Sequence, residues 1–198
     1  MMTHLKQLSH ALTTPLLTGL ALLSSGSVWA HPGHDELLEN SSLMAGLLHP
    51  LTGFDHLVML IGVGFIASQM AQRSHAVRVM VSAIVLLLAG MAMGALSGFA
   101  TGIEAMILAS VGVAAVALYR RQGAASTLLS TLAVSLVLFH GWAHGLEASG
   151  NALAGFATGM IGSASLLIST GYLLGRKVSP KWQSAMVAVS GVVLVLAG

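Results

Sequence analysis

Long apolar runs alternate with short polar segments along most of this chain. From residue 43 onwards the pattern predicts six α-helices, since a membrane-spanning strand would instead alternate apolar and polar residues. The predicted helices cover residues 43–71, 77–98, 102–119, 125–147, 152–175 and 182–197. Except for the last, which is short, each is about long enough to cross ~30 Å of hydrocarbon. We therefore expect an all-α polytopic membrane protein with six transmembrane helices.

The composition agrees with this expectation. Of the 198 residues, 56% are hydrophobic and only 7% are charged, whereas a soluble domain has about 25% charged residues. So few charges cannot build a water-facing surface, and lipid must therefore cover most of the protein. The chain has no cysteine, which excludes disulfides, iron–sulfur clusters and thiolate metal sites.

The N-terminal segment is similar to a secretory signal peptide. A weakly basic start precedes a short apolar stretch over residues 16–23, and the small residues Val28 and Ala30 precede the expected cleavage site. The apolar stretch is too short to span a bilayer comfortably. We predict a signal peptide over residues 1–30, a periplasmic tail over residues 31–42 and a six-helix transmembrane domain over residues 43–198.

Two histidines in the predicted tail are candidate metal ligands. After cleavage, His31 would offer both its amine and its imidazole to one ion, and His34 would add another nitrogen. The alternative is a solvated polar tail, and these residues do not separate the two interpretations.

The basic residues between the apolar runs predict the orientation. They occupy the first, third and fifth connections: Arg73, Arg78, Arg120, Arg121, Arg176, Lys177 and Lys181. Because cytoplasmic loops are enriched in Lys and Arg, these connections should face the cytoplasm. We expect a multi-pass protein of the bacterial inner membrane with its mature N-terminus in the periplasm. The short basic clusters form no face for a nucleic acid.

Glycines four residues apart predict close helix packing. They are Gly90, Gly94 and Gly98 in the second predicted helix and Gly171 and Gly175 in the fifth. Small residues at this spacing allow helix backbones to approach each other within a membrane.

Two histidines and a carboxylate share one face of the fourth predicted helix, near its outer end. His140 and His144 are four residues apart, and Glu147 follows three residues later. One ion could therefore contact both imidazoles. Gly141 and Gly145 are expected to leave room beside the rings. In the structural alternative, each imidazole hydrogen-bonds to a neighbouring carbonyl.

A second polar segment interrupts the first predicted helix. Pro50 and Gly53 separate His49 from Asp55 and His56, and this pair of residues should break the helix between Pro50 and Gly53. Broken membrane helices line cavities, and transporters build substrate sites from them. Asp55 could bind a metal directly or orient a neighbouring imidazole. In the structural alternative, Asp55 caps the helix that follows the break.

Both polar segments lie in the outer halves of their helices and at matching depth, so they could form one site. Glu104 should face the same side, whereas His75 is expected to be a solvated residue of the first cytoplasmic connection. Imidazole and carboxylate without thiolate suit nickel, cobalt or zinc.

The segments 49–56 (HPLTGFDH) and 139–147 (FHGWAHGLE) together resemble the HupE/UreJ family of small nickel and cobalt permeases. The signal peptide, the exported start and the six-helix layout extend this resemblance over nearly the whole chain. It implies import of Ni²⁺ or Co²⁺ into the cytoplasm to supply an enzyme such as hydrogenase or urease. The implied functional positions are His49, Asp55, His56, His140, His144 and Glu147.

Two other functions use the same ligands. One is a metal-binding membrane accessory protein that transports nothing, and the other is an intramembrane zinc enzyme. We expect no enzyme activity, because no separate general base is evident, and no bound cofactor. The chain lacks a phosphate-binding loop, so a gradient or a partner must drive any transport. The sequence leaves the oligomeric state open, a homo-oligomer included.

Overall fold

A computed structural model describes residues 42–120, 123–147 and 152–197, and these residues form seven α-helices and no strand. The helices are α3 (Ser42–Thr52), α4 (Phe54–Ser68), α5 (Arg73–Ser97), α6 (Ile103–Tyr119), α7 (Ala124–Glu147), α8 (Ala152–Gly175) and α9 (Pro180–Ala197). The predicted signal peptide over residues 1–30, and His31 and His34 of the predicted tail, lie outside the described residues.

Four helices are long and apolar enough to cross a membrane, namely α5, α7, α8 and α9. The bent pair of α3 and α4 forms a fifth candidate span if it is counted as one, and α6 is a shorter apolar helix of 17 residues. The all-helical, multi-pass prediction is therefore confirmed, while the count of six spans stays a prediction.

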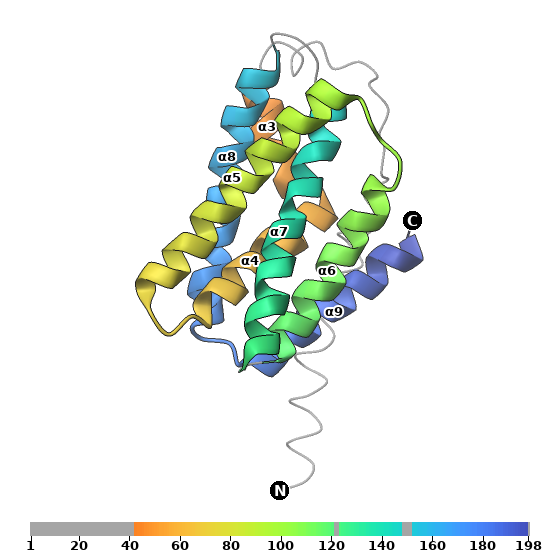
Figure 1. The fold of residues 1–198 in the computed structure, drawn as a ribbon. Coiled ribbons are helices and arrows are strands. Elements are labelled where there is room, and N and C mark those ends of the chain that lie inside the picture. Colours follow the sequence, from red (N-terminus) through yellow and green to blue (C-terminus); the bar gives the residue numbers. More distant parts are fainter. Residues whose placement is uncertain (1–41, 121–122, 148–151, 198) are drawn as a thin grey trace, which may run out of the picture. The chain divides into compact units, whose positions relative to one another are not determined.

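The first predicted helix is broken, and the break lies at Gly53. The axes of α3 and α4 differ by 75°, and Gly53 between them adopts an extended conformation (φ −76°, ψ 111°). Pro50 is not part of the break, because it lies inside the last turn of α3. There the Thr52 hydroxyl donates to the Leu48 carbonyl oxygen at 3.1 Å. Both α3 and α4 rest on α8 (Figure 1).

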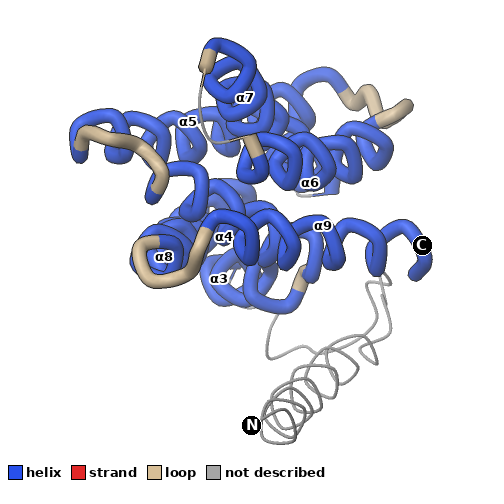
Figure 2. Tube along the Cα trace, turned by 90° about the horizontal axis from the view of Figure 1, so that it is seen from below, coloured by secondary structure: helices blue, strands red, loops and turns tan. Residues whose placement is uncertain are grey.

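The helices form two layers. When the molecule is viewed along the helices, α5, α6 and α7 lie in one layer and α3, α4, α8 and α9 in the other (Figure 2). α4 contacts helices of both layers, and its residues from Val58 to Ala67 are almost all buried. All of α4 after its first turn therefore lies in the interior of the helix bundle, and His56 is the buried residue of the first turn.

Glycines allow α5 and α7 to approach closely, as expected for Gly90 and Gly94. A Cβ atom at Gly90 would collide with the Leu138 carbonyl, and one at Gly94 with the Trp142 carbonyl. The prediction for Gly98 is wrong. Gly98 ends α5 with a left-handed conformation (φ 63°) and has no neighbour in the space that a Cβ would occupy. Its role is helix termination, since glycine adopts positive φ without steric cost.

Gly141 and Gly145 belong to the same α5–α7 contact, so their predicted role beside the imidazoles is wrong. A Cβ at Gly141 would collide with the Leu87 carbonyl, and one at Gly145 with the Met91 carbonyl. Each glycine follows a histidine by one residue, and one residue turns the side chain by roughly 100° around a helix. The glycines therefore face α5 while the imidazoles face the α3–α4 bend.

The contact of α8 with α4 uses the same principle. A Cβ atom at Gly171 would collide with the Ile61 carbonyl, and one at Gly64 would collide with the Ile168 carbonyl. Gly175 lies against the Ser68 side chain. The packing predicted for Gly171 and Gly175 is therefore confirmed.

Candidate metal centre

Four imidazoles meet at the bend between α3 and α4. His49 comes from the end of α3, His56 from the first turn of α4, and His140 and His144 from the last turns of α7. The ring centroids of His49 and His144 are 4.3 Å apart, those of His56 and His144 4.5 Å, and those of His56 and His140 5.0 Å. His56, His140 and His144 are buried. The two polar segments thus meet, as their matching depth predicted.

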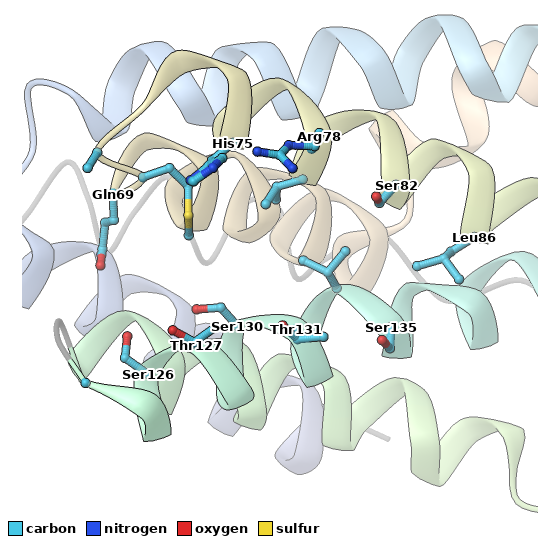
Figure 3. Close-up of a pocket in the computed structure, with 15 residues that line it drawn as sticks. Gln69, His75, Arg78, Ser82, Leu86, Ser126, Thr127, Ser130, Thr131 and Ser135 are labelled. Atoms are coloured by element: carbon cyan, nitrogen blue, oxygen red, sulfur yellow. The ribbon is translucent and has the colours of Figure 1, made fainter.

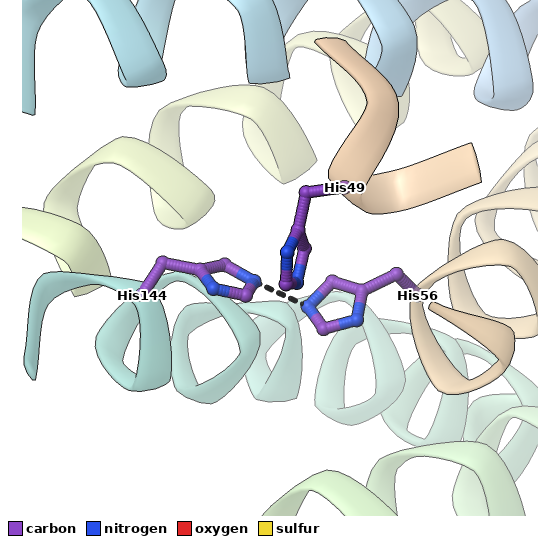
Figure 4. Close-up of side chains that lie close together, drawn as sticks. All are labelled: His49, His56 and His144. Atoms are coloured by element: carbon purple, nitrogen blue, oxygen red, sulfur yellow. Dashed lines mark hydrogen bonds between the residues drawn. The ribbon is translucent and has the colours of Figure 1, made fainter. Parts of the chain in front are cut away.

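Three of these rings converge on one point. His49, His56 and His144 can each supply one ring nitrogen, with all three nitrogens within 4.8 Å of one another. The Nε2 atoms of His56 and His144 are 2.6 Å apart (Figure 4). An ion bound by both nitrogens at ~2.0–2.1 Å would replace the shared proton and widen their separation to about 3 Å.

Asp55 orients His56 for this role. The Nδ1 atom of His56 lies 2.9 Å from Asp55 Oδ1, and it must donate because an ionised carboxylate only accepts. The lone pair of His56 is therefore on Nε2, the atom that faces His144. A carboxylate behind a ligating imidazole fixes its tautomer and raises its basicity. The capping role considered for Asp55 is wrong, since Gly53 precedes α4 and no side chain caps the helix.

A second group of potential ligands lies beside the first and shares His56. Asp55, His56 and His140 can each supply one atom within 4.8 Å of the others. The Oδ2 atom of Asp55 is 4.0 Å from His140 Nδ1, and this nitrogen is buried with no hydrogen-bond partner among the described residues.

Ser110 of α6 determines which nitrogen of His140 carries the proton. Its Oγ lies 2.6 Å from the Ile107 carbonyl, to which it must donate, and 2.8 Å from His140 Nε2. The hydroxyl oxygen therefore accepts from Nε2–H, which leaves the lone pair of His140 on Nδ1, facing Asp55. Ser110 was not among the residues expected from the sequence, and its only signal is a hydroxyl within an apolar run. The structural alternative, in which each imidazole hydrogen-bonds to a neighbouring carbonyl, is wrong. His140 instead pairs with Ser110, and His144 pairs with His56.

Glu147 lies at the edge of the cluster. Its Oε2 is 3.6 Å from His144 Nδ1, and its side chain is 68% exposed. It belongs to neither ligand group among the described residues. A small movement would let its carboxylate accept a hydrogen bond from His144 Nδ1–H when Nε2 binds an ion.

Two further residues weighed from the sequence lie apart from the cluster. Glu104 is exposed in the first turn of α6 and joins neither ligand group. His75 is exposed, as expected, but it belongs to the first turn of α5 and not to a loop.

Comparison with known proteins agrees with the family resemblance noted from the sequence. The family model described as "HupE / UreJ protein" matches residues 19–198. A protein named "Protein HupE", from Rhizobium leguminosarum bv. viciae, is 31% identical over 193 residues, which cover 92% of this chain and 94% of that protein. No solved structure matches significantly.

Proposed function

Because this chain belongs to the HupE/UreJ family, we propose that it is a secondary permease that imports Ni²⁺ or Co²⁺ across the bacterial inner membrane. The ion is its substrate and would supply a metalloenzyme such as hydrogenase or urease. The protein itself performs no covalent chemistry and holds no resident cofactor.

The observation that carries this proposal is a pair of acceptors that face each other in the histidine cluster. His140 Nδ1 is buried and has no hydrogen-bond partner among the described residues, and the atom that it faces at 4.0 Å, Asp55 Oδ2, is also an acceptor. Unpaired polar atoms are costly inside a membrane protein. A divalent cation satisfies both atoms, and the ligand set of imidazole and carboxylate suits nickel or cobalt.

The break at Gly53 supports transport over static binding. His49 and His56, on opposite sides of the break, belong to the same ligand group. A change in the 75° angle between α3 and α4 would separate these two ligands. Transporters use such discontinuous helices to bind and release ions near the middle of the membrane. Motion at this bend would release the ion toward the other side.

The distribution of charge supports the direction of import. Arg73 and Arg78 lie at the start of α5, Arg120 follows the end of α6, and Arg176 and Lys177 follow α8. His140 and His144 lie in the last turns of α7, at the opposite end of that helix from the connection that follows Arg120. Under the positive-inside rule, the cluster belongs to the outward half of the protein.

Accumulation of radiolabelled nickel in cells tests the proposal. Cells that express the wild type should accumulate nickel, and excess cobalt should compete. The variant His56→Ala should accumulate no more than empty cells at matched membrane levels, while Glu104→Gln, which changes an exposed carboxylate outside the cluster, should match the wild type.

Normal uptake by His56→Ala would contradict this assignment. In liposomes, nickel binding by the purified wild type without accumulation would instead indicate the accessory protein. Lower nickel in expressing cells than in empty cells would reverse the direction.

A further inference from the structure

A cavity of about 680 Å³ separates the first halves of α5 and α7 (Figure 3). The two helices touch in their second halves through Gly90, Gly94, Gly141 and Gly145, and they diverge toward their starts (Figure 1). The cavity thus begins at the end of α7 opposite to the histidine cluster, near Arg78 of α5, and extends along α7 as far as Ser135.

Hydroxyl groups dominate the polar wall of this cavity. They belong to Ser82 of α5 and to Ser126, Thr127, Ser130, Thr131 and Ser135 of α7. On α7 they form two adjacent pairs, Ser126–Thr127 and Ser130–Thr131, four residues apart, with Ser135 four residues after Thr131, so they share one side of the helix. None of the six hydroxyls makes a hydrogen bond to a residue that the structure describes, not even to a carbonyl one turn earlier.

This lack of partners determines what fills the cavity. α7 is a candidate membrane span, and a hydroxyl that faces hydrocarbon without a partner costs roughly 1–3 kcal/mol. Six such groups around one cavity therefore favour water over lipid chains as its content. Water would give each hydroxyl both a donor and an acceptor.

The charges around the cavity suit the passage of a cation but not its retention. His75 and Arg78 of α5 line the cavity, and no carboxylate does so within the described part of the chain. Arg78 donates from Nε to the Ser74 carbonyl at 3.4 Å, which keeps its guanidinium near the start of α5. Neutral hydroxyls can contact a hydrated divalent ion, whereas tight binding would require anionic or imidazole ligands that converge on it.

The cavity ends close to the histidine cluster. Ser135 precedes His140 by five residues, which is about 7.5 Å along the axis of α7. The lining ends at Leu86 on α5 and at Ser135 on α7, and the buried residues Leu87 and Val137 follow these positions. Apolar side chains therefore come next to the cavity on the side of the cluster.

We propose that this cavity is a water-filled vestibule on the cytoplasmic side, through which the hydrated ion leaves after it passes Val137 and Leu87. This inference rests on the proposed function, since the vestibule completes a path that begins at the cluster. The ligand class is a hydrated divalent cation, held loosely by hydroxyl oxygens so that it can leave.

Substituted cysteines test the content of the cavity, because the natural chain has none. The variants are Ser130→Cys and Ser135→Cys, which line the cavity. The control is Leu132→Cys, whose leucine lies on the same turns of α7, is 44% exposed and does not line the cavity. Inside-out membrane vesicles are treated with a charged, membrane-impermeant methanethiosulfonate.

We expect both cavity cysteines to react at least about tenfold faster than the control, because a thiol ionises and reacts where water reaches it and is inert in apolar surroundings. Equal rates for all three would overturn the proposal. Disulfide-linked dimers of the two cavity variants would also overturn it, since they would make the cavity an interface between two copies. Faster reaction in right-side-out vesicles would place the cavity on the wrong side.

Nickel uptake after labelling tests the exit route itself. Labelled Ser135→Cys should lose uptake, because the bound group fills the vestibule. Labelled Ser179→Cys, at an exposed position in the α8–α9 connection outside the cavity, should retain it. Unchanged uptake by labelled Ser135→Cys would overturn the exit route. A wild type that moves no nickel would refute the proposed function, while the labelling rates would still decide separately whether water fills the cavity.

Discussion

Asp55 Oδ2 and His140 Nδ1 face each other at 4.0 Å, from α4 and α7, and both atoms are hydrogen-bond acceptors. The other oxygen of Asp55 accepts from His56, and the other nitrogen of His140 donates to Ser110. Each partner thus presents a lone pair to the same space. A cation between them would convert this repulsive pair into two favourable contacts, which makes the relationship the centre of the predictions below.

Removal of the charge at Asp55 should separate metal affinity from stability. In Asp55→Asn, the amide oxygen can still accept from His56, and a shift of about 1 Å from the present 4.0 Å would let the amide nitrogen donate to His140 Nδ1, so that the cluster satisfies itself without an ion. We expect nickel affinity, measured by calorimetry in detergent, to fall by about 10–100-fold or more, with no loss of thermal stability. Glu104→Gln, at an exposed carboxylate outside the cluster, should bind as the wild type does. An unchanged affinity of Asp55→Asn would contradict the role of this carboxylate.

Ser110 should act through His140 alone. Without the hydroxyl, the proton of His140 is no longer held on Nε2 and can move to Nδ1, the atom that would face the ion. We expect Ser110→Ala to lower nickel affinity by about 10–100-fold and to shift the ¹⁵N spectrum of His140 toward the other tautomer. Ser163→Ala is the control, because Ser163 is equally buried and its hydroxyl contacts only carbonyls of its own helix. Equal nickel binding by the two variants would refute the role of Ser110.

The contact between α5 and α7 should not tolerate a methyl group. Gly141→Ala would place a Cβ against the Leu87 carbonyl, which belongs to rigid helix backbone. We expect a loss of about 1–3 kcal/mol of stability, as for other overpacked interiors. Thermal unfolding in detergent measures it, with Gly112→Ala as control, because a Cβ at Gly112 in α6 meets no atom within 4 Å. A midpoint for Gly141→Ala equal to that of the control would contradict the packing.

A substitution at the Gly53 bend should change nickel binding more than it changes thermal stability. Gly53 has a backbone conformation that alanine also adopts, but a Cβ there would lie 3.1 Å from His56 Nδ1 and 3.3 Å from Asp55 Oδ1. We expect Gly53→Ala to weaken nickel binding by less than the roughly 10–100-fold loss expected for Asp55→Asn, with little change in thermal stability. Pro50→Ala should leave binding unchanged, since Pro50 lies inside α3. A larger effect of Pro50→Ala than of Gly53→Ala would place the functional break at the proline.

The local pattern along the chain was enough to predict the helices, the broken first helix and the shared face of His140 and His144. These features depend on the spacing of apolar residues, on proline and glycine, and on the helical period, all of which are properties of neighbouring residues. The same pattern could not distinguish a packing glycine from a terminating one, as Gly98 shows, or tell that Gly141 faces α5.

Only the tertiary structure decided which atoms of the cluster bear lone pairs. The tautomer of His140 depends on Ser110, thirty residues earlier, and that of His56 on Asp55 and on His144, which is 88 residues away. The hydroxyls along α7 line a cavity only because α5 and α7 separate between the glycine contacts and the starts of the two helices. By itself the sequence determined a membrane protein with histidines suited to a metal. The partners of each ring nitrogen and the cavity depend instead on contacts between helices that are distant in the sequence, and no local periodicity encodes such contacts.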